Sequence, residues 1–398
     1  MKKTLVALAA LSVVGLASAQ VTITGAVDIS FGKLAGGEFG INNGMNYAAN
    51  PASQTEGGTF YNGFDKNVNA SFIAFKGTED LGGGLSAGFN LTTAGMDMSH
   101  GATSINFGRE SFVSLSSKGL GTLQVGRQTA PIASIGGAYD LTHGNMSGYL
   151  GNAAGAFRAS SRRSNQAQFI SEPVMGGLVI RAGLQMQGDQ NEDVSFATGG
   201  GSAYTASSTA DGTATNVASY KHVVTLGGNY NSGPLSIGLG FETAASNCKS
   251  LREGIVLGGS YDLGVAKIAA MWAQNPNIGG STSPNCIGAA TNVTGLTLFN
   301  APRTGQRYGA GATISASMPL GATTLAAAYS SNTEQGTTGY ELIAKYALSK
   351  STNLYASYFA VGGTVATAAV AAVAAGNLGV AAIPTDPSST NIGIRMTF

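Results

Sequence analysis

Residues 307–318 read RYGAGATISASM, and this stretch decides the fold class of the chain. Every second residue from Tyr308 to Met318 is apolar, and the residues between them are glycine, threonine and serine. Successive side chains of a β-strand point to opposite faces, so the stretch predicts a strand with one apolar face and one small, polar face. A face of this composition is typical of a wall that borders water, and not of one that borders a packed core.

The same period-two alternation recurs along the chain, for example in 178–187, in 235–242 and in the last segment, 391–398. It predicts sixteen antiparallel strands, roughly at 21–31, 67–77, 84–93, 109–117, 121–127, 162–171, 177–187, 219–231, 234–243, 253–262, 264–273, 305–318, 321–330, 338–348, 351–360 and 389–398.

The connections between these strands alternate in length. Seven short turns are expected at 78–83, 118–120, 172–176, 232–233, 263, 319–320 and 349–350. Eight longer loops are expected at 32–66, 94–108, 128–161, 188–218, 244–252, 274–304, 331–337 and 361–388. Short turns on one rim and long loops on the other are the layout of an outer-membrane barrel. An even strand number lets the first strand pair with the last, which leaves no open edge in lipid.

The composition excludes the main alternatives. Charged residues make up only 10% of the chain, against the usual quarter, so a soluble globule would be poorly solvated. No run reaches the roughly 18 apolar residues of a membrane helix. The formal net charge of +1 gives no indication of nucleic-acid binding. We therefore predict an all-β fold, a 16-stranded antiparallel transmembrane β-barrel, in contact with outer-membrane lipid and lipopolysaccharide.

The first 19 residues are typical of a signal peptide. Lys2 and Lys3 supply the positive start, an apolar segment of 4–16 follows, and Ala-Ser-Ala at 17–19 is a small-residue cleavage site. A membrane anchor is the alternative, but the apolar segment is shorter than the ~20 residues that a spanning helix needs. We expect a signal peptide at 1–19 and one barrel domain at 20–398, in the outer membrane.

The two cysteines, Cys248 and Cys286, lie in polar stretches that are expected to be loops. In an oxidising compartment a disulfide between neighbouring loops is the favoured interpretation, with free thiols or metal ligands as alternatives. A metal site would need further ligands nearby, and none is evident, so neither a metal nor a cofactor is predicted.

The width of the barrel leads from fold to function. Sixteen strands leave room for an aqueous channel, whereas eight strands do not. The sequence thus predicts a passive, water-filled diffusion channel for small hydrophilic solutes and ions, and not an enzyme.

Several motifs, in order along nearly the whole mature chain, support this interpretation: FKGTEDLGGGL at 75–85, FGRESFV at 107–113, GTLQVGRQ at 121–128, YALSK at 346–350 and IRMTF at 394–398. With them the chain resembles the general porins of Gram-negative outer membranes, in particular their β-proteobacterial branch. The resemblance implies a homotrimer and a third loop, 128–161, that folds inward to form the constriction. It also implies that Phe398 is an assembly signal, although a lipid-facing aromatic residue would explain it as well.

The same resemblance places Arg109, Arg127 and Arg162 on the wall of the pore constriction. Alternation supports Arg162, which shares its predicted face with Gln166. For the other two, alternation conflicts with the resemblance, because Arg109 shares a face with Val113 and Arg127 shares one with apolar residues of its own strand. We nevertheless expect both in the lumen; the alternative is a set of ion pairs in the subunit interface.

Three more residues complete the predicted constriction. Arg181 points inward by alternation, Arg158 ends the inward loop, and Asp140 is the acid that this loop offers. His143 nearby is interpreted as an ordinary loop residue. Since arginines outnumber acids, we predict weak anion selectivity, which should fade as salt rises.

One position departs from the family pattern. Where relatives commonly carry an arginine on the second strand, this chain has Phe72. The exchange removes one wall charge and adds apolar surface. The last long loop, 361–388, is also unusual in its Ala- and Val-rich run at 365–375, for which a spacer, a short helix over the barrel mouth and a hydrophobic ligand patch remain open.

Three other functions fit the sequence less well. An enzymatic barrel would need a nucleophile and a base, but His100, His143 and His222 occur in no triad context. A substrate-specific channel for an anionic small solute would favour aromatic residues along the lumen, whereas the tyrosines mostly follow the lipid-facing positions. A secreted β-sandwich or adhesin would dissolve without detergent.

Overall fold

The computed structural model describes residues 20–34, 59–62, 71–93, 106–142, 162–186, 220–246, 251–274, 310–332, 337–363 and 388–398. Nearly all of them lie in strands: β1 (Gln20–Leu34), β2 (Thr59–Asn62), β3 (Phe72–Gly82), β4 (Leu85–Thr92), β5 (Glu110–Ser117), β6 (Gly121–Thr129), β7 (Arg162–Ser171), β8 (Leu178–Met186), β9 (Tyr220–Ser232), β10 (Leu235–Ser246), β11 (Leu251–Asp262), β12 (Lys267–Gln274), β13 (Ala310–Leu320), β14 (Thr323–Asn332), β15 (Thr337–Ala347), β16 (Thr352–Gly363) and β17 (Ser388–Thr397).

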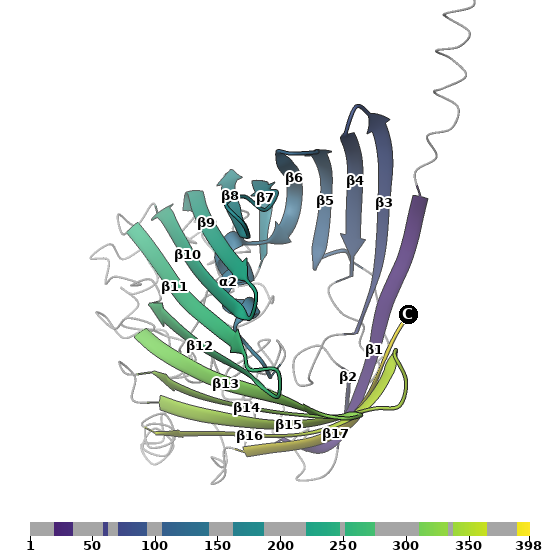
Figure 1. Cartoon of the computed structure of the whole chain (residues 1–398), viewed down its shortest axis with the longest axis vertical. Coiled ribbons are helices and arrows are strands. Elements are labelled where there is room, and N and C mark those ends of the chain that lie inside the picture. The colour runs from purple at the N-terminus through teal and green to yellow at the C-terminus, as the bar shows by residue number, and fades with distance from the viewer. Residues whose placement is uncertain are drawn as a thin grey trace, which may run out of the picture.

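The strands form one closed antiparallel ring (Figure 1). From β3 onward each strand pairs with its neighbour in the chain, and β1 closes the ring against β17 with Ile29 opposite Ile394. Beyond that ladder, the amides of Gly25 and Phe398 each donate to the carbonyl of the other residue. First-with-last pairing leaves the sheet without an open edge, as the even strand number predicted.

The sheet contains seventeen strands, but they occupy sixteen places in the ring. Both β2 and β3 pair with the same edge of β1, β2 along Ile29–Gly32 and β3 along Gln20–Ala26. The two short segments therefore share one place. The predicted 16-stranded barrel is confirmed, while the expectation of a loop throughout 32–66 is wrong at β2.

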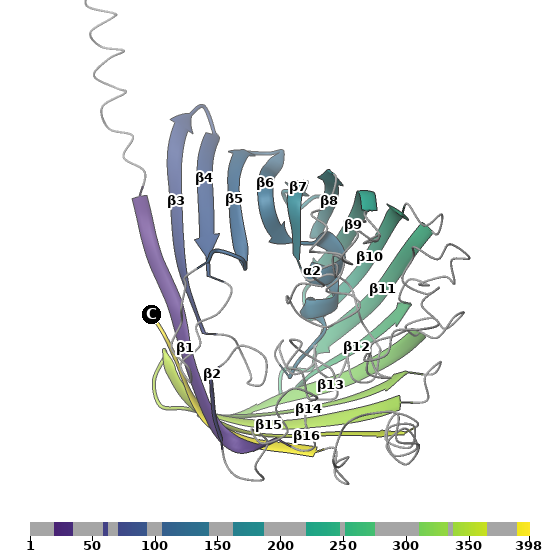
Figure 2. The same cartoon turned by 180° about the vertical axis from the view of Figure 1, so that it is seen from behind.

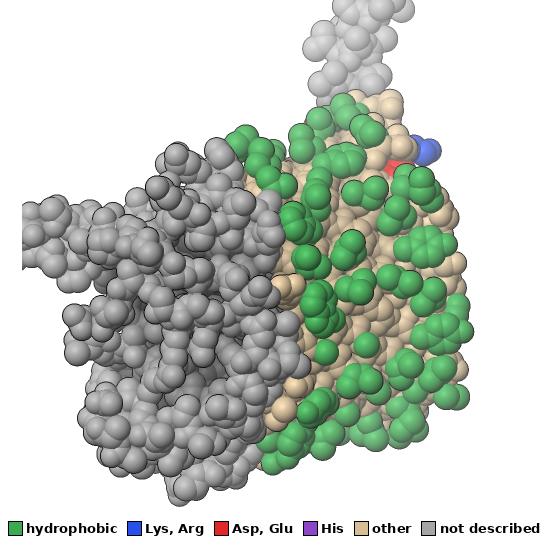
Figure 3. All heavy atoms as spheres, turned by 90° about the vertical axis from the view of Figure 1, so that its left-hand side faces the viewer, with side chains coloured by type: hydrophobic (Ala, Val, Ile, Leu, Met, Phe, Trp, Pro, Cys, Tyr) green, Lys and Arg blue, Asp and Glu red, His purple; other side chains and the backbone are tan. Residues whose placement is uncertain are grey.

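Along the strands, side chains alternate between an exposed apolar outer face and a polar inner face, as predicted. In β10 the side chains of Ile237 and Leu239 are exposed on the outside, whereas Gly238 and Glu242 on the other face are buried. The view in Figure 3 shows apolar side chains spread over the described surface, with charged side chains only at its upper edge. Fully buried polar residues such as Gln166 and Gln185 line the inner face. The barrel is thus apolar outside and polar inside.

Strand ends differ from the prediction mainly at the first short turn. The turn expected at 78–83 consists only of Gly83 and Gly84, both with positive φ, and β3 continues to Gly82. The polar residues 78–80 suggested a turn because they are hydrophilic. At the rim of a barrel, however, polar residues continue the ladder beyond the lipid, and the Asp80 carboxylate there accepts a hydrogen bond from the amide of Gly82.

The helix of the described ranges, α2 (Pro131–Ala138), follows β6 and lies within the ring in both views of Figures 1 and 2. Pro131 starts it, which is a favoured position because the first helical amides have no intrahelical acceptor. Ile132 and Ile135 are buried against β9, β10 and β11. No helix in the described ranges has the length and hydropathy needed to cross a membrane.

Candidate functional site

Three arginines lie close together at the ends of β5, β6 and β7, and we call them the arginine cluster: Arg109, Arg127 and Arg162. The charge of Arg162 interacts with those of the other two and with that of Glu110. Like charges held together in this way repel one another, so the cluster is a region of positive potential.

Arg109 directly precedes β5, and its guanidinium lies over the ring of Phe72, 5.3 Å from the ring centroid. Alternation within β5 predicted an outward position. This alternation does not extend to Arg109, because the segment before the strand turns at Asn106, whose side chain accepts a hydrogen bond from the amide of Gly108. Burial lowers the pKa of the Arg109 guanidinium from its ordinary value, opposed by Glu110 and reinforced by Arg395. The ordinary pKa of arginine is so high that the group stays charged.

Arg127 joins three segments of the wall. Its Nε donates to the carbonyl of Gly108, and one terminal nitrogen donates to Ser164 Oγ at 2.8 Å. The register between β6 and β7 shifts here, because two steps from Gly126 to Gln128 face three steps along β7. Simple alternation therefore fails at this end of the two strands.

The same register shift between β6 and β7 lies beside Arg162. Asn165 of β7 has φ of 49°, in the left-handed region. On the Arg162 side of Asn165, the buried inner position belongs to Arg163. Its guanidinium forms an ion pair with Glu242 of β10 at 2.5 Å. The alternation argument for Arg162 is therefore wrong, although its charge does interact with the rest of the cluster.

Glu110 is the acid within the arginine cluster, and the sequence did not single it out. Asn90 Nδ2 donates to one carboxylate oxygen at 2.6 Å, and Thr129 Oγ1 donates to the other at 3.0 Å. Both oxygens are thus held by neutral donors on β4 and β6. The neighbouring Arg109 in the FGRESFV motif is the only sequence signal that pointed to this place.

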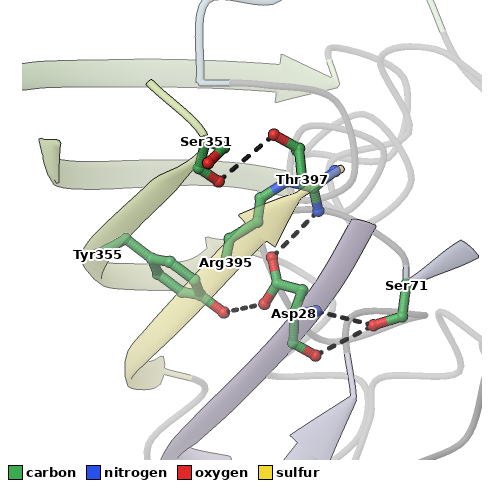
Figure 4. Close-up of polar contacts among 6 residues, drawn as sticks. All are labelled: Asp28, Ser71, Ser351, Tyr355, Arg395 and Thr397. Carbon is green, nitrogen blue, oxygen red and sulfur yellow. Dashed lines mark hydrogen bonds and ion pairs between the residues drawn. The ribbon is translucent and has the colours of Figure 1, made fainter. Parts of the chain in front are cut away.

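A second charged group lies at the seam between the first and last strands (Figure 4). Asp28 of β1 is fully buried; it accepts hydrogen bonds from Tyr355 Oη at 2.5 Å and from Arg395 at 3.3 Å. The Ser71 hydroxyl accepts the amide of Asp28 and donates to its carbonyl, at the break between β2 and β3. Arg395 was visible in the sequence as the charged residue on the small, polar face of the last strand.

The two groups are electrostatically connected. The charge of Arg395 acts on Arg109 on one side and on Lys345 of β15 on the other. Glu341, also on β15 and fully buried, interacts with Lys345 and with Asp140. The seam group is thus linked electrostatically to the arginine cluster on one side and, through β15, to the start of the third loop on the other.

The described start of the predicted inward loop, 130–142, runs along the inner wall. The ring of Tyr139 packs directly against Gly238 of β10 and Gly258 of β11. A Cβ at either position would lie within 3 Å of the Tyr139 side chain. Its hydroxyl lies 3.2 Å from Ser236 Oγ, and the amide of Leu141 donates to Ser315 of β13. The remaining part, 143–161 with His143 and Arg158, lies outside the described residues.

Asp140 follows Tyr139 in the chain, and Arg181 is linked to the Tyr139 hydroxyl through Asn229. Asp140 is buried, and its carboxylate accepts the amide and hydroxyl of Thr142. Arg181 of β8 points inward as alternation predicted, and donates to Asn229 of β9 at 2.8 Å. The amide of Asn229 in turn donates to the Tyr139 hydroxyl. Arg181 therefore belongs to the hydrogen-bond network that holds the start of the loop.

Phe398, expected as an assembly signal, directly follows β17, and its side chain is exposed with its ring edge over Gly25. Cys248, Cys286 and most of the Ala-rich loop at 361–388 fall outside the described residues. Within those residues, no group of three or more histidines, cysteines and acids is placed to hold a metal ion.

The described inner face thus carries charged and hydrogen-bonding side chains, and such groups are the means by which pores discriminate between ions. Comparisons with known proteins agree with this geometry. A family model described as Gram-negative porin matches residues 4–364. The chain is 32% identical over 313 residues to "Outer membrane porin protein 32" of Delftia acidovorans, an alignment that covers 74% of this chain and 77% of that protein.

Solved structures show the same fold. An "Anion-selective porin from Comamonas acidovorans" superposes with a TM-score of 0.61 at 22% identity, over 96% of this chain and 100% of that one. A "Salmonella typhi OmpF complex with Daunomycin" also gives a TM-score of 0.61, at 12% identity, over 96% of this chain and 98% of that one. At these identities the likeness is evidence of fold.

Proposed function

This chain belongs to the Gram-negative porins and is a channel protein of the outer membrane, not an enzyme, and from that premise we propose that it forms a passive, water-filled pore that prefers anions. Small hydrophilic solutes and ions are its cargo. The observation that carries the preference is the arginine cluster, in which three cations accompany one acid, Glu110.

We infer that the charges of the arginine cluster act on passing ions. Both carboxylate oxygens of Glu110 accept hydrogen bonds from the neutral side chains of Asn90 and Thr129, and its single negative charge is outnumbered by the charges of the three arginines. The net charge of +1 over the whole chain is too small to bias ions by itself. Placement therefore decides the selectivity. The likeness to an anion-selective porin supports the same proposal.

The predicted constriction follows from the course of the third loop. We expect 128–161 to narrow the lumen opposite the arginine cluster, with Arg158 and Asp140 contributing charges. Support comes from residues 130–142, which lie along the inner wall from β9 to β13. A 16-stranded ring without such a segment would admit large solutes.

The remaining proposals concern maturation and assembly. Removal of 1–19 would leave Gln20, the residue at which β1 begins, as the new N-terminus. Cys248 and Cys286 are expected to form a disulfide between loops. A homotrimer, each subunit with its own pore, is expected from the family resemblance, and three equal closing steps in single-channel records would demonstrate it.

The reversal potential across a planar bilayer with a potassium chloride gradient tests the anion preference. The mature protein should give a potential of the sign set by chloride. Replacing all three arginines of the cluster by glutamine should shift the potential toward that of an unselective pore, while the exposed turn variant Lys350→Gln should not. A potential of the sign set by potassium in the mature protein would overturn the proposal.

A further inference from the structure

Phe72 and Arg109 come from different parts of the wall and meet on its inner side. Phe72 begins β3 and is paired with Ala26, which lies on the same face of β1 as Asp28. The Arg109 guanidinium lies 5.3 Å from the centroid of the Phe72 ring. A cation at this distance over an aromatic face is attracted by the quadrupole of the ring.

The guanidinium groups of four other arginines donate hydrogen bonds to protein acceptors. Arg127 binds Gly108 and Ser164, and Arg163 forms an ion pair with Glu242. Arg181 binds Asn229 and Arg395 binds Asp28, as described above. The main-chain amide of Arg109 donates to the carbonyl of Thr92, but the contact of its guanidinium among the described residues is the ring of Phe72, without a side-chain hydrogen bond or ion pair to that part of the chain.

The nature of the restraint matters for the charge. A carboxylate that held Arg109 in place would also neutralise it and occupy its N–H groups. An aromatic ring restrains the guanidinium but carries no net charge and accepts at its face only, so the N–H edge stays available. That edge is a planar fork of donors whose geometry matches the two oxygens of a carboxylate.

From this arrangement we propose that Phe72 is a positioning residue, which presents Arg109 to passing solutes as a fixed donor fork and makes the pore favour small carboxylates over halide ions. The inference rests on the proposed anion pore and names the class of solute that this pore favours. A chloride ion gains only from the charge of Arg109, whereas a carboxylate gains from both charge and geometry.

Permeability ratios of acetate to chloride, from bi-ionic reversal potentials, test the proposal. Phe72→Leu and Phe72→Met keep an apolar side chain of similar volume but remove the ring, and should lower the ratio about two- to fivefold, the range expected for an exposed to half-buried cation–π contact. Phe72→Tyr keeps the ring and should retain the ratio of the unaltered protein. Arg109→Gln should lower the ratio at least as much.

The decisive comparison is the double variant. In the Arg109→Gln background, Phe72→Leu should have no further effect, because the ring then has no guanidinium to hold. An unchanged ratio in both ring-less variants, or an equal loss with and without Arg109, would overturn the proposal. Stepwise open-channel conductance in each variant shows that the barrel has folded.

The outcome also separates this inference from the proposed function. A cation-preferring mature protein would contradict the anion pore, whatever the variants do. The coupling between positions 72 and 109 is the difference between the effects of Phe72→Leu with and without Arg109. It can be measured whether the pore prefers anions or cations. Its absence in an anion-preferring protein would contradict the role of Phe72 alone.

Discussion

Asp28 shows at the scale of one residue how the barrel keeps a charge in its wall. The carboxylate is fully buried at the seam, yet Tyr355 and Arg395 donate to its oxygens, and Ser71 satisfies its main chain (Figure 4). Buried charges are tolerated when they are hydrogen-bonded and paired in this way. The seam thus joins β1, β16 and β17 by side chains as well as by the main-chain ladder.

Tyr355→Phe should destabilise this seam. The variant removes the hydroxyl that donates to Asp28 at 2.5 Å and leaves a buried carboxylate oxygen without that donor. A loss of about 1–3 kcal/mol in the free energy of unfolding is expected, measured by urea unfolding in lipid vesicles. Tyr346→Phe, at a half-exposed position on the outer face, is the matched control and should change little. Equal stability of the two variants would show that the seam contact contributes nothing.

Glu110→Gln should strengthen the anion preference. The exchange keeps the shape of the side chain but removes the negative charge that acts on Arg109 and Arg162. The reversal potential in a potassium chloride gradient should move further toward that of chloride. Glu79→Gln, near the turn end of β3, serves as the control with the same change of net charge. A shift of the same size in both variants would mean that the anion preference does not depend on where the acid lies in the barrel.

At the scale of elements, α2 depends on the strands beneath it. The helix has eight residues without a charged side chain, which is too short to be stable alone. Its apolar side chains and Tyr139 pack on a wall made flat by Gly227, Gly238 and Gly258. The glycines of β9 to β11 thus provide the surface on which the third loop begins.

Gly258→Ala should disturb this packing. The new Cβ would lie 2.2 Å from Cδ2 of Tyr139, so the ring must move and the loop with it. We expect altered single-channel conductance and more frequent closures under voltage. Gly259→Ala adds the same methyl group on the outer face, where the nearest atom is 3.4 Å away, and should behave like the unaltered protein. Identical records from both variants would contradict the role of the glycine wall.

The strands could be predicted from the sequence because their period-two pattern reflects lipid on one side and water on the other. The helix could not, since its stability comes from partners on β9 to β11 that lie far away in the chain. Neither could the inner contacts of the arginines. The extra residue in β7 near Asn165 changes which neighbour faces inward, and no composition signal marks it. The stacking of Arg109 on Phe72 likewise depends on how β3 and β5 approach each other.

At the scale of the whole molecule, the closed ring separates two solvents. Its apolar outside suits lipid, and its inside carries polar and charged side chains from several strands. Fixed charges act over about a Debye length, roughly 8 Å at physiological salt and ~3 Å at 1 M. The anion preference should therefore be largest in dilute salt and decline as the mean concentration rises at a constant gradient. A preference that does not change with salt would indicate a short-range binding site in place of a charged wall.

Single-channel conductance as a function of salt concentration tests the central claim most directly. For a passive, water-filled pore, the conductance of the mature protein in planar bilayers should increase in proportion to the bulk conductivity of potassium chloride once the fixed charges are screened. A conductance that reaches a plateau, or a folded protein that produces no conductance steps at all, would contradict the account.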